Sequence, residues 1–147
     1  MSIIVMKFGG TSVADIDCIK NVAQKVVNQY KKNKKIVVVV SAMSGATDSL
    51  VNLTNQISEK RNLEEYDVVV SSGEQVTAGL LAMAISDLSV KSRSLMGWQI
   101  PIITDDTHYK AIIENISNTN IFTLLNNEEI IVIPGFQGVT SENRIST

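Results

Sequence analysis

Five consecutive β-branched residues stand at positions 36–40, which read Ile-Val-Val-Val-Val. A run of this kind, without alternating polar residues, is typical of a strand buried on both faces of a parallel sheet. A similar apolar run, Ile-Ile-Val-Met, occupies positions 3–6. Between the two runs, apolar side chains recur at helical spacing from Val13 to Tyr30. The order of strand, helix and strand predicts an α/β fold with a parallel sheet.

The same alternation continues to the end of the sequence. We predict helices from the turn after position 40 to about Lys60, from Leu63 to Ile85, and over residues 119–127. Gly73 is a candidate break in the second of these, because glycine costs about 1 kcal/mol in a helix. Strands are expected at 91–96, 101–104, 111–116 and 129–133, with a hairpin over 135–147. The predicted fold class is an incomplete three-layer αβα sandwich with a mostly parallel sheet.

Charge and composition limit the possible partners. Hydrophobic residues make up 44% of the 147-residue chain and charged residues 19%, which suits one globular domain. The net charge of −2 gives no electrostatic case for nucleic acid or membrane lipids. Four lysines at 31, 32, 34 and 35 suit a helix carboxyl terminus. The single Cys18 cannot form an internal disulfide, and neither a signal peptide nor a membrane-length apolar run is visible, so we expect a cytoplasmic protein.

Local capping signals accompany the helices. Asp15 is expected to cap the helix that ends at Tyr30, and Asp48 the helix that follows the second strand.

The first candidate binding motif follows the first strand directly. In open α/β sheets ligands bind outside the carboxyl ends of the strands. Paired glycines there let backbone N–H groups approach phosphate oxygens, and a lysine adds a positive charge. The lysine precedes the glycines, so this is not a Walker A loop. A surface lysine beside an ordinary glycine turn remains the alternative. The motif is Lys7-Phe8-Gly9-Gly10-Thr11-Ser12.

Two further polar motifs follow later. The turn from Ser41 to Thr47 places hydroxyls and backbone amides at a helix amino terminus, where they suit a carboxylate, although an ordinary capped turn explains it too. The segment Ser-Ser-Gly-Glu ends at Glu74, whose carboxylate suits a substrate ammonium group or simply faces solvent. The lone His108 is expected to be structural or superficial.

Taken together, the motifs resemble those of the aspartokinases, within the wider amino-acid kinase family. The resemblance runs from about Val5 to Thr147 and includes the hexapeptide at 7–12, Ser-Ala-Met-Ser-Gly-Ala-Thr at 41–47, Ser-Gly-Glu at 72–74 and Gly-Phe-Gln-Gly at 135–138. It implies transfer of the γ-phosphate of Mg-ATP to the β-carboxylate of L-aspartate, the first step of lysine, threonine and methionine (diaminopimelate) biosynthesis. It implies no metal ligand among the candidate residues.

The resemblance also assigns roles to individual residues. Lys7 is similar to the lysine that contacts the ATP phosphates and stabilises the transition state, and Phe8, Gly9 and Gly10 would complete that ATP-binding loop. The substrate residues that it implies are Thr47 as a ligand of aspartate, Glu74 as the acid that receives the aspartate ammonium group, and Ser41 and Gly135 in the same cleft.

The sequence departs from the family in what it lacks. Aspartokinases continue with a glycine-rich segment that carries an arginine, a serine and an aspartate, then with a nucleotide-binding half and regulatory domains. We therefore expect residues 1–147 to form the amino-terminal, substrate-side part of the kinase domain, with sheet edges left unpaired. One interpretation is a split enzyme that works with a separate carboxyl-terminal half or as a homo-oligomer. Others are an inactive remnant or partial binding module, and, against the hexapeptide, a kinase of glutamate or carbamate.

Overall fold

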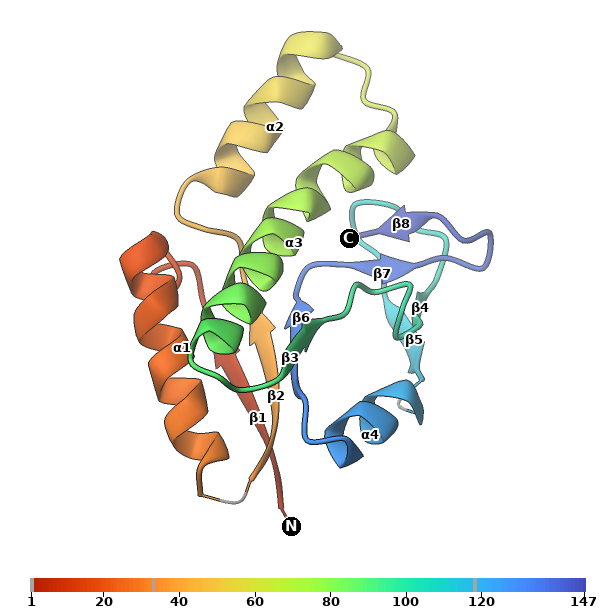
Figure 1. The fold of residues 1–147 in the computed structure, drawn as a ribbon. Coiled ribbons are helices and arrows are strands. Elements are labelled where there is room, and N and C mark those ends of the chain that lie inside the picture. Colours follow the sequence, from red (N-terminus) through yellow and green to blue (C-terminus); the bar gives the residue numbers. More distant parts are fainter. Residues whose placement is uncertain (1, 33, 118) are drawn as a thin grey trace.

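The computed structural model describes residues 2–32, 34–117 and 119–147. Its main sheet has four strands in the order β1-β2-β6-β3, all parallel (Figure 1). The strands are β1 (Ile3–Phe8), β2 (Lys35–Val40), β6 (Ile130–Pro134) and β3 (Ser92–Ser94). The run of β-branched residues therefore forms an interior strand, as predicted, with β1 and β6 as its neighbours.

Helices cover the two faces of this sheet unequally. The helices α1 (Ile16–Tyr30) and α3 (Leu63–Asp87) pack on one face and enclose the larger core cluster. The short α4 (Thr119–Asn126) packs on the other face, over β6. The helix α2 (Ala46–Ile57) has no buried residue and forms, with the first half of α3, an arm that extends beyond the sheet (Figure 1). The predicted three-layer α/β architecture is confirmed.

The prediction that Gly73 interrupts a helix is wrong, because α3 runs unbroken over 25 residues. Contacts with α1, α2 and the sheet outweigh the roughly 1 kcal/mol propensity cost of each glycine. By length and hydropathy alone α3 is the one described helix that is apolar enough to cross a membrane, but half of its apolar window is buried inside the fold. A core helix of a folded domain has these properties too.

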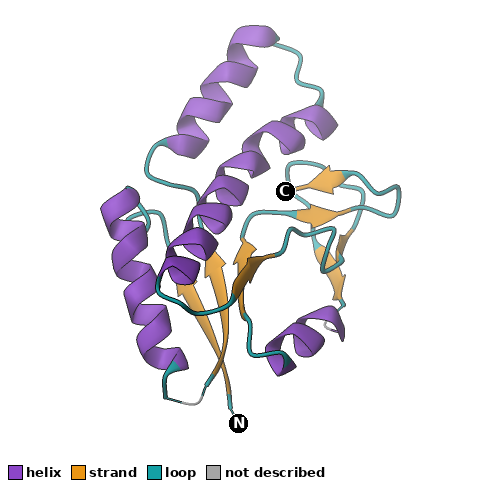
Figure 2. Cartoon of the chain, in the orientation of Figure 1, coloured by secondary structure: helices purple, strands orange, loops and turns teal. Residues whose placement is uncertain are grey.

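A second, smaller sheet was not predicted as a separate unit. Its order is β5-β4-β7-β8, and only the β4–β7 pair is parallel. Its strands are β4 (Ile102–Thr104), β5 (Ile113–Ile116), β7 (Gly138–Val139) and β8 (Ile145–Ser146). The last two form the predicted hairpin (Figure 2). The sheet stands beside the carboxyl end of β6 and contacts α3 through β8.

The two predicted caps have different outcomes. Asp15 is the N-cap of α1, where its side chain accepts a hydrogen bond of 2.8 Å from the backbone N–H of Cys18. Asp48 does not cap α2. The N-cap is Gly45, which has a φ of +72° and supplies no side-chain cap, so Asp48 lies inside the first turn. The positive φ favours glycine at this position.

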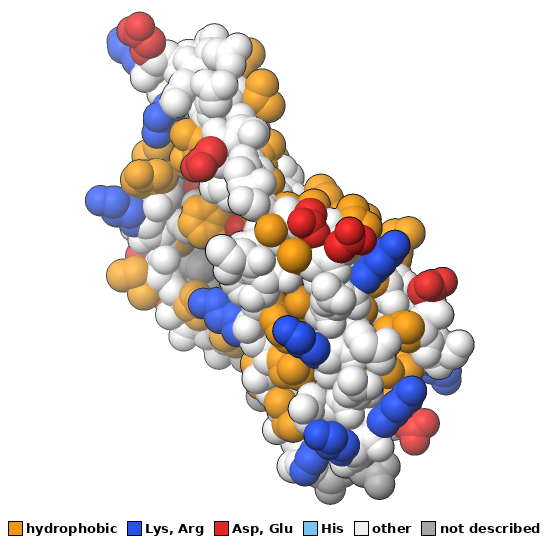
Figure 3. Space-filling view, turned by 90° about the vertical axis from the view of Figure 1, so that its left-hand side faces the viewer, with side chains coloured by type: hydrophobic (Ala, Val, Ile, Leu, Met, Phe, Trp, Pro, Cys, Tyr) orange, Lys and Arg blue, Asp and Glu red, His pale blue; other side chains and the backbone are white. Residues whose placement is uncertain are grey.

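One part of the main sheet lacks a covering layer within the described chain. On β1, Ile3 and Val5 point away from α1 and remain 43% and 66% exposed. Parallel sheets are normally covered on both faces. Figure 3 views the molecule from the side of α1, where the sheet is covered. Basic, acidic and apolar side chains are interspersed on that surface and do not gather in one patch. The exposed face of β1 is therefore the unfinished part of the sandwich.

Candidate functional site

A cleft of about 420 Å³ opens where β1 and β2 end and α2 begins. Its walls come from the loop after β1, the turn after β2, the first turn of α2 and the middle of α3. Lining residues are Gly10, Thr11, Ser41, Ala42, Met43, Ser44, Gly45, Thr47, Asp48 and Glu74. The carboxyl edge of a parallel sheet is where open α/β folds bind ligands. Three motifs that lie far apart in the sequence thus meet in one place.

Backbone hydrogen bonds hold the strand ends that carry the cleft. The N–H of Ser41 donates to the carbonyl of Phe8 at 3.1 Å, and the N–H of Gly135 donates to the carbonyl of Val40 at 2.8 Å. A β-carbon on Gly135 would lie 3.3 Å from that same carbonyl oxygen. The ends of β1, β2 and β6 are therefore locked together, and Gly135 permits the closest of these approaches.

Glu74 reaches the cleft because α3 lies very close to the turn after β2. A β-carbon on Gly73 would lie 3.0 Å from the β-carbon of Ala42. Glu74 itself is 5% exposed, and its Oε2 atom has no hydrogen-bond partner among the described residues. Burial raises the pKa of Glu74, while interaction with the backbone of Ala42 opposes that shift. A buried carboxylate oxygen without a partner is a ready acceptor for a cationic group.

The charged side chains that line the cleft are both acidic. Asp48 and Glu74 carry carboxylates, and the remaining lining residues are uncharged. The first turn of α2, which includes Thr47, also faces the cleft without a side-chain cap. Its backbone N–H groups lack acceptors within the helix and favour an anionic group. The cleft therefore offers a carboxylate for an ammonium group and a helix terminus for a carboxylate, as an α-amino acid requires.

The predicted ATP-side residues lie beside this cleft rather than in its wall, except for Gly10. Phe8 packs against the core under α1 and α3, and Lys7 points to the opposite, exposed face of β1. A β-carbon on Gly9 would meet nothing within 4 Å, so its backbone is open to a ligand. Lys7 and Glu74 thus lie on opposite sides of the sheet edge. The structure brings Gly10, Ser41, Thr47 and Glu74 together and places Lys7, Phe8, Gly9 and Gly135 around them.

Comparison with known proteins shows the family to which the chain belongs. A sequence model of the amino acid kinase family matches residues 2–147. The chain belongs to the amino acid kinase family. It is 45% identical over 150 residues to the aspartokinase of Rickettsia conorii (strain ATCC VR-613 / Malish 7), covering all of this chain and 37% of that protein. It is 47% identical over 147 residues to the aspartokinase of Geobacillus stearothermophilus, covering 36% of it.

Solved structures of family members show the same fold. Aspartate kinase from Synechocystis matches with a TM-score of 0.80 and 36% identity, over 99% of this chain and 23% of that one. Aspartokinase III of E. coli, in complex with aspartate and ADP, matches with a TM-score of 0.86 and 21% identity, over 100% of this chain and 43% of that one. The chain spans about a third of the length of the curated relatives that it matches.

The amino acid kinase fold here also uses lining residues to which sequence analysis gave no separate role. Thr11 belongs to the predicted hexapeptide and Ala42, Met43 and Ser44 to the predicted turn, so the motifs were located but their members were not distinguished. Asp48, predicted as a cap, lies within the first turn of α2. Its position next to Thr47 is the sequence signal that places it at the cleft.

Among residues 2–32, 34–117 and 119–147, no group of three or more His, Cys, Asp or Glu side chains is placed to hold a metal ion.

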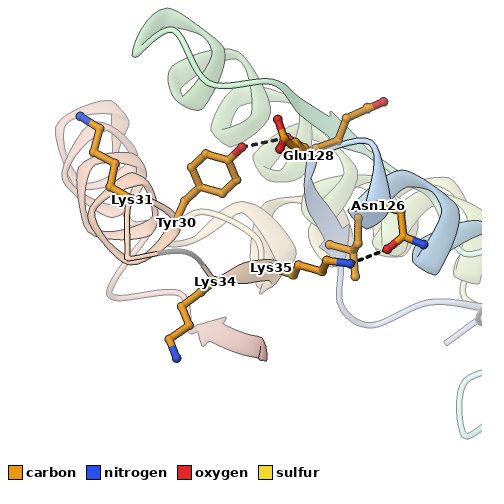
Figure 4. Close-up of a pocket in the computed structure, with 8 residues that line it drawn as sticks. Tyr30, Lys31, Lys34, Lys35, Asn126 and Glu128 are labelled. Atoms are coloured by element: carbon orange, nitrogen blue, oxygen red, sulfur yellow. Dashed lines mark hydrogen bonds between the residues drawn. The ribbon is translucent and has the colours of Figure 1, made fainter. Parts of the chain in front are cut away.

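A second cavity, of about 350 Å³, lies at the opposite end of the sheet, beyond the carboxyl terminus of α1 (Figure 4). Lysines and glutamates line it together, and the lysine side chains point in different directions. The Lys35 ammonium bonds to the side chain of Asn126, and the Tyr30 hydroxyl donates to the carbonyl of Glu128 at 3.2 Å. These hydrogen bonds join α1 and β2 to the end of α4 and to the loop that follows it, so this cavity lies at a structural junction.

Proposed function

We propose that this chain forms the amino-acid side of an aspartate kinase, which transfers the γ-phosphate of ATP to the β-carboxylate of L-aspartate. The observation that carries the proposal is the buried carboxylate of Glu74 in the same cleft as the first turn of α2: its Oε2 atom has no hydrogen-bond partner in the described part of the chain, and that turn has no side-chain cap. In this arrangement Glu74 receives the substrate ammonium group. Thr47 and the first-turn amides of α2 receive the α-carboxylate, and Ser41 lines the same wall.

The reaction balances as a simple displacement. A β-carboxylate oxygen of aspartate attacks the γ-phosphorus, the bond from that phosphorus to the β,γ-bridging oxygen breaks, and ADP leaves with the electron pair. The product is 4-phospho-L-aspartate. Phosphoryl transfer depends mainly on positioning and electrostatic stabilisation, so it needs no strong base in the cleft. Lys7 would stabilise charge on the transferred group, while Phe8, Gly9 and Gly10 form the strand-end loop beside the phosphates, with Mg²⁺ bound to the ATP.

The names of the relatives support this proposal. Both curated relatives described above are aspartokinases, and the E. coli structure holds aspartate and ADP. We further propose that activity needs a segment equivalent to the remaining two thirds of those proteins. The uncovered face of β1 at Ile3 and Val5 is where an additional layer would pack. A cytoplasmic location, a place in lysine biosynthesis and an assembly with a separate half or a second copy complete the proposal.

The decisive experiment traps acyl phosphate as its hydroxamate. The assay contains Mg-ATP and aspartate, with this chain alone and with the carboxyl-terminal part of the G. stearothermophilus aspartokinase, a combination called here the completed enzyme. We expect product only from the completed enzyme, and none when glutamate replaces aspartate. Product from this chain alone would contradict the need for a second part. No product from either, with a folded chain, would favour an inactive remnant or a binding module.

A further inference from the structure

Outside the cleft, the most heavily bonded buried acid is Asp67 in the second turn of α3. Its carboxylate is fully buried. The backbone N–H of Tyr109 donates to both of its oxygens, at 3.2 and 3.1 Å. The backbone N–H of Thr147 donates to Oδ2 at 3.2 Å, and the Thr147 hydroxyl donates to Oδ1 at 2.6 Å. Nδ1 of His108 lies 2.8 Å from Oδ2.

These bonds join three parts of the chain that are distant in sequence. Asp67 belongs to α3, His108 and Tyr109 to the loop between β4 and β5, and Thr147 follows β8. His108 is therefore structural, as expected. The small sheet is held at the same junction, because Thr147 directly follows β8, and within that sheet the hydroxyls of Thr104 in β4 and Ser146 in β8 lie 2.7 Å apart. Asp67 is thus the point at which α3 and the small sheet are fixed to each other.

The spacing along α3 connects this junction to the cleft. Asp67, Ser71 and Glu74 are separated by four and three residues, so they share one face of the helix, and all three are buried. Seven residues correspond to about two turns, or roughly 10 Å along the helix axis. The contact between Gly73 and Ala42 sets how closely α3 approaches the cleft, and the buried Ala78, Leu81 and Ile85 hold the later turns of α3 in the core. Asp67 provides a separate attachment for the first turns, about two turns before Glu74 on the same face of the helix.

We propose that Asp67 is a positioning residue for the amino-acid site: its buried carboxylate ties the first half of α3 to Thr147 and to the 108–109 loop, and so holds that half of the helix in the orientation that directs Glu74 into the cleft. The inference rests on the proposed function for the identity of the ligand that Glu74 receives. The geometric claim, that Asp67 controls the environment of Glu74, is testable without any activity.

The principal variant is Asp67→Asn, which has nearly the same volume but replaces one acceptor oxygen by a donor NH₂ group. Asp87→Asn is the matched control, because Asp87 is an exposed residue at the end of the same helix. In the 147-residue chain, amide exchange is measured by NMR. We expect the Tyr109 and Thr147 amides of Asp67→Asn to exchange at least ten-fold faster than in the wild type, with the amide of Val38 in β2 unchanged. Unchanged exchange at Tyr109 and Thr147 would overturn the proposal.

A second measurement separates positioning from a purely structural role. The titration of Glu74 is followed by carboxyl ¹³C NMR. If Asp67 directs Glu74, the midpoint in Asp67→Asn moves toward that of an ordinary glutamate, because the Glu74 carboxyl gains solvent. If the Glu74 midpoint is unchanged while the amides of Tyr109 and Thr147 exchange faster, Asp67 stabilises the contact with the small sheet without positioning Glu74. That result would overturn the proposal. Should Asp67→Asn fail to fold, Thr147→Val removes only the hydroxyl bond to Oδ1, and the same two readouts decide.

In the completed enzyme, Asp67→Asn is expected to raise the KM for aspartate at least ten-fold while the KM for ATP changes less than two-fold. Equal changes in both constants would contradict a positioning role at the amino-acid site. A wild-type completed enzyme that does not use aspartate would refute the proposed function alone, since the exchange and titration experiments still decide whether Asp67 positions Glu74.

Discussion

Gly73 of α3 packs directly on Ala42 of the turn after β2, so closely that a β-carbon on Gly73 would lie 3.0 Å from the β-carbon of Ala42 and 3.4 Å from Cδ1 of Leu50. The absence of a side chain at Gly73 brings two motifs together that are about thirty positions apart in the sequence. Because Glu74 is the next residue, this contact also determines how far its carboxylate enters the cleft.

The first prediction concerns that contact. Gly73→Ala gains about 1 kcal/mol of helix propensity, but overpacking costs about 1–3 kcal/mol, so we expect a net loss of stability. Gly79→Ala is the matched control in the same helix, because a β-carbon there meets nothing within 4 Å. It should stabilise the chain by up to about 1 kcal/mol. Thermal unfolding checks both variants, and an equal stabilisation by the two would show that the Gly73 contact is not tight.

The second prediction follows from the pKa of Glu74, which burial raises. The folded state then binds this proton more tightly than the unfolded chain does. Protonated Glu74 therefore contributes to the free energy of unfolding at low pH, and this contribution is lost as the pH rises through the raised pKa. Glu74→Gln cannot ionise. We expect it to be more stable than the wild type at pH 7, on the order of 1 kcal/mol, the scale for an unpartnered buried oxygen.

Below the ordinary pKa of glutamate the difference between Glu74→Gln and the wild type should vanish, because both side chains are then neutral. Thermal unfolding at several pH values measures this, with Glu59→Gln as the control on an exposed glutamate. In the completed enzyme the same substitution should raise the KM for aspartate more than that for ATP. A variant that is less stable at pH 7 and uses aspartate normally would remove Glu74 from the site.

The third prediction concerns Lys7, which is exposed at the end of β1. Lys7→Ala should change the free energy of unfolding by less than about 0.5 kcal/mol, as is usual for surface positions. In the completed enzyme it should lower kcat by about 10²–10³-fold, the scale for loss of one charge-stabilising group. Lys20→Ala, on the exposed side of α1, is the control. Near-normal turnover by Lys7→Ala in the hydroxamate assay would contradict its assigned role.

The fourth prediction tests the uncovered face of the sheet. Val5 in β1 and Val76 in α3 are both well exposed, at 66% and 57%. Replacing one methyl group by a hydroxyl in Val5→Thr should weaken association with the carboxyl-terminal part by roughly 1 kcal/mol, the scale for one buried methylene. Val76→Thr should have no such effect. Titration calorimetry measures both affinities, and equal affinities for the two variants would show that this face of β1 is not the interface.

The sequence predicted the elements whose cause is local. The β-branched run at 36–40 forms β2, in which every residue of the run but the partly buried Val39 is buried, and Asp15 caps α1 through a bond to a residue three positions away. The common location of the strand-end motifs was also predicted from the sequence, because parallel strands place their carboxyl ends at one edge of the sheet. Glu74 was located by its polar character within an apolar helical stretch, and the cleft that it lines was found from these motifs.

Several features were missed because they depend on distant neighbours. Gly73 is a disfavoured residue in an isolated helix, and only the Ala42 turn packed against it explains its place in α3. The cap role of Asp48 failed because the left-handed turn at Gly45 starts the helix earlier. The spacing of Asp67, Ser71 and Glu74 indicates a polar helix face, but its partners, Tyr109 and Thr147, lie forty-two and eighty positions away.

Local sequence pattern therefore accounts for the buried parallel strands, the amphipathic helix between them and the composition of the binding motifs. Each of these follows from side-chain periodicity and backbone preference within a few residues. Contacts between distant segments establish that α3 is continuous, that Lys7 and Glu74 lie on opposite sides of the sheet edge, and that Asp67 attaches the small sheet to α3. These three features depend on close packing between distant segments. The effect of a missing β-carbon or of a buried carboxylate is set by the residues that pack against it, and local sequence does not identify those residues.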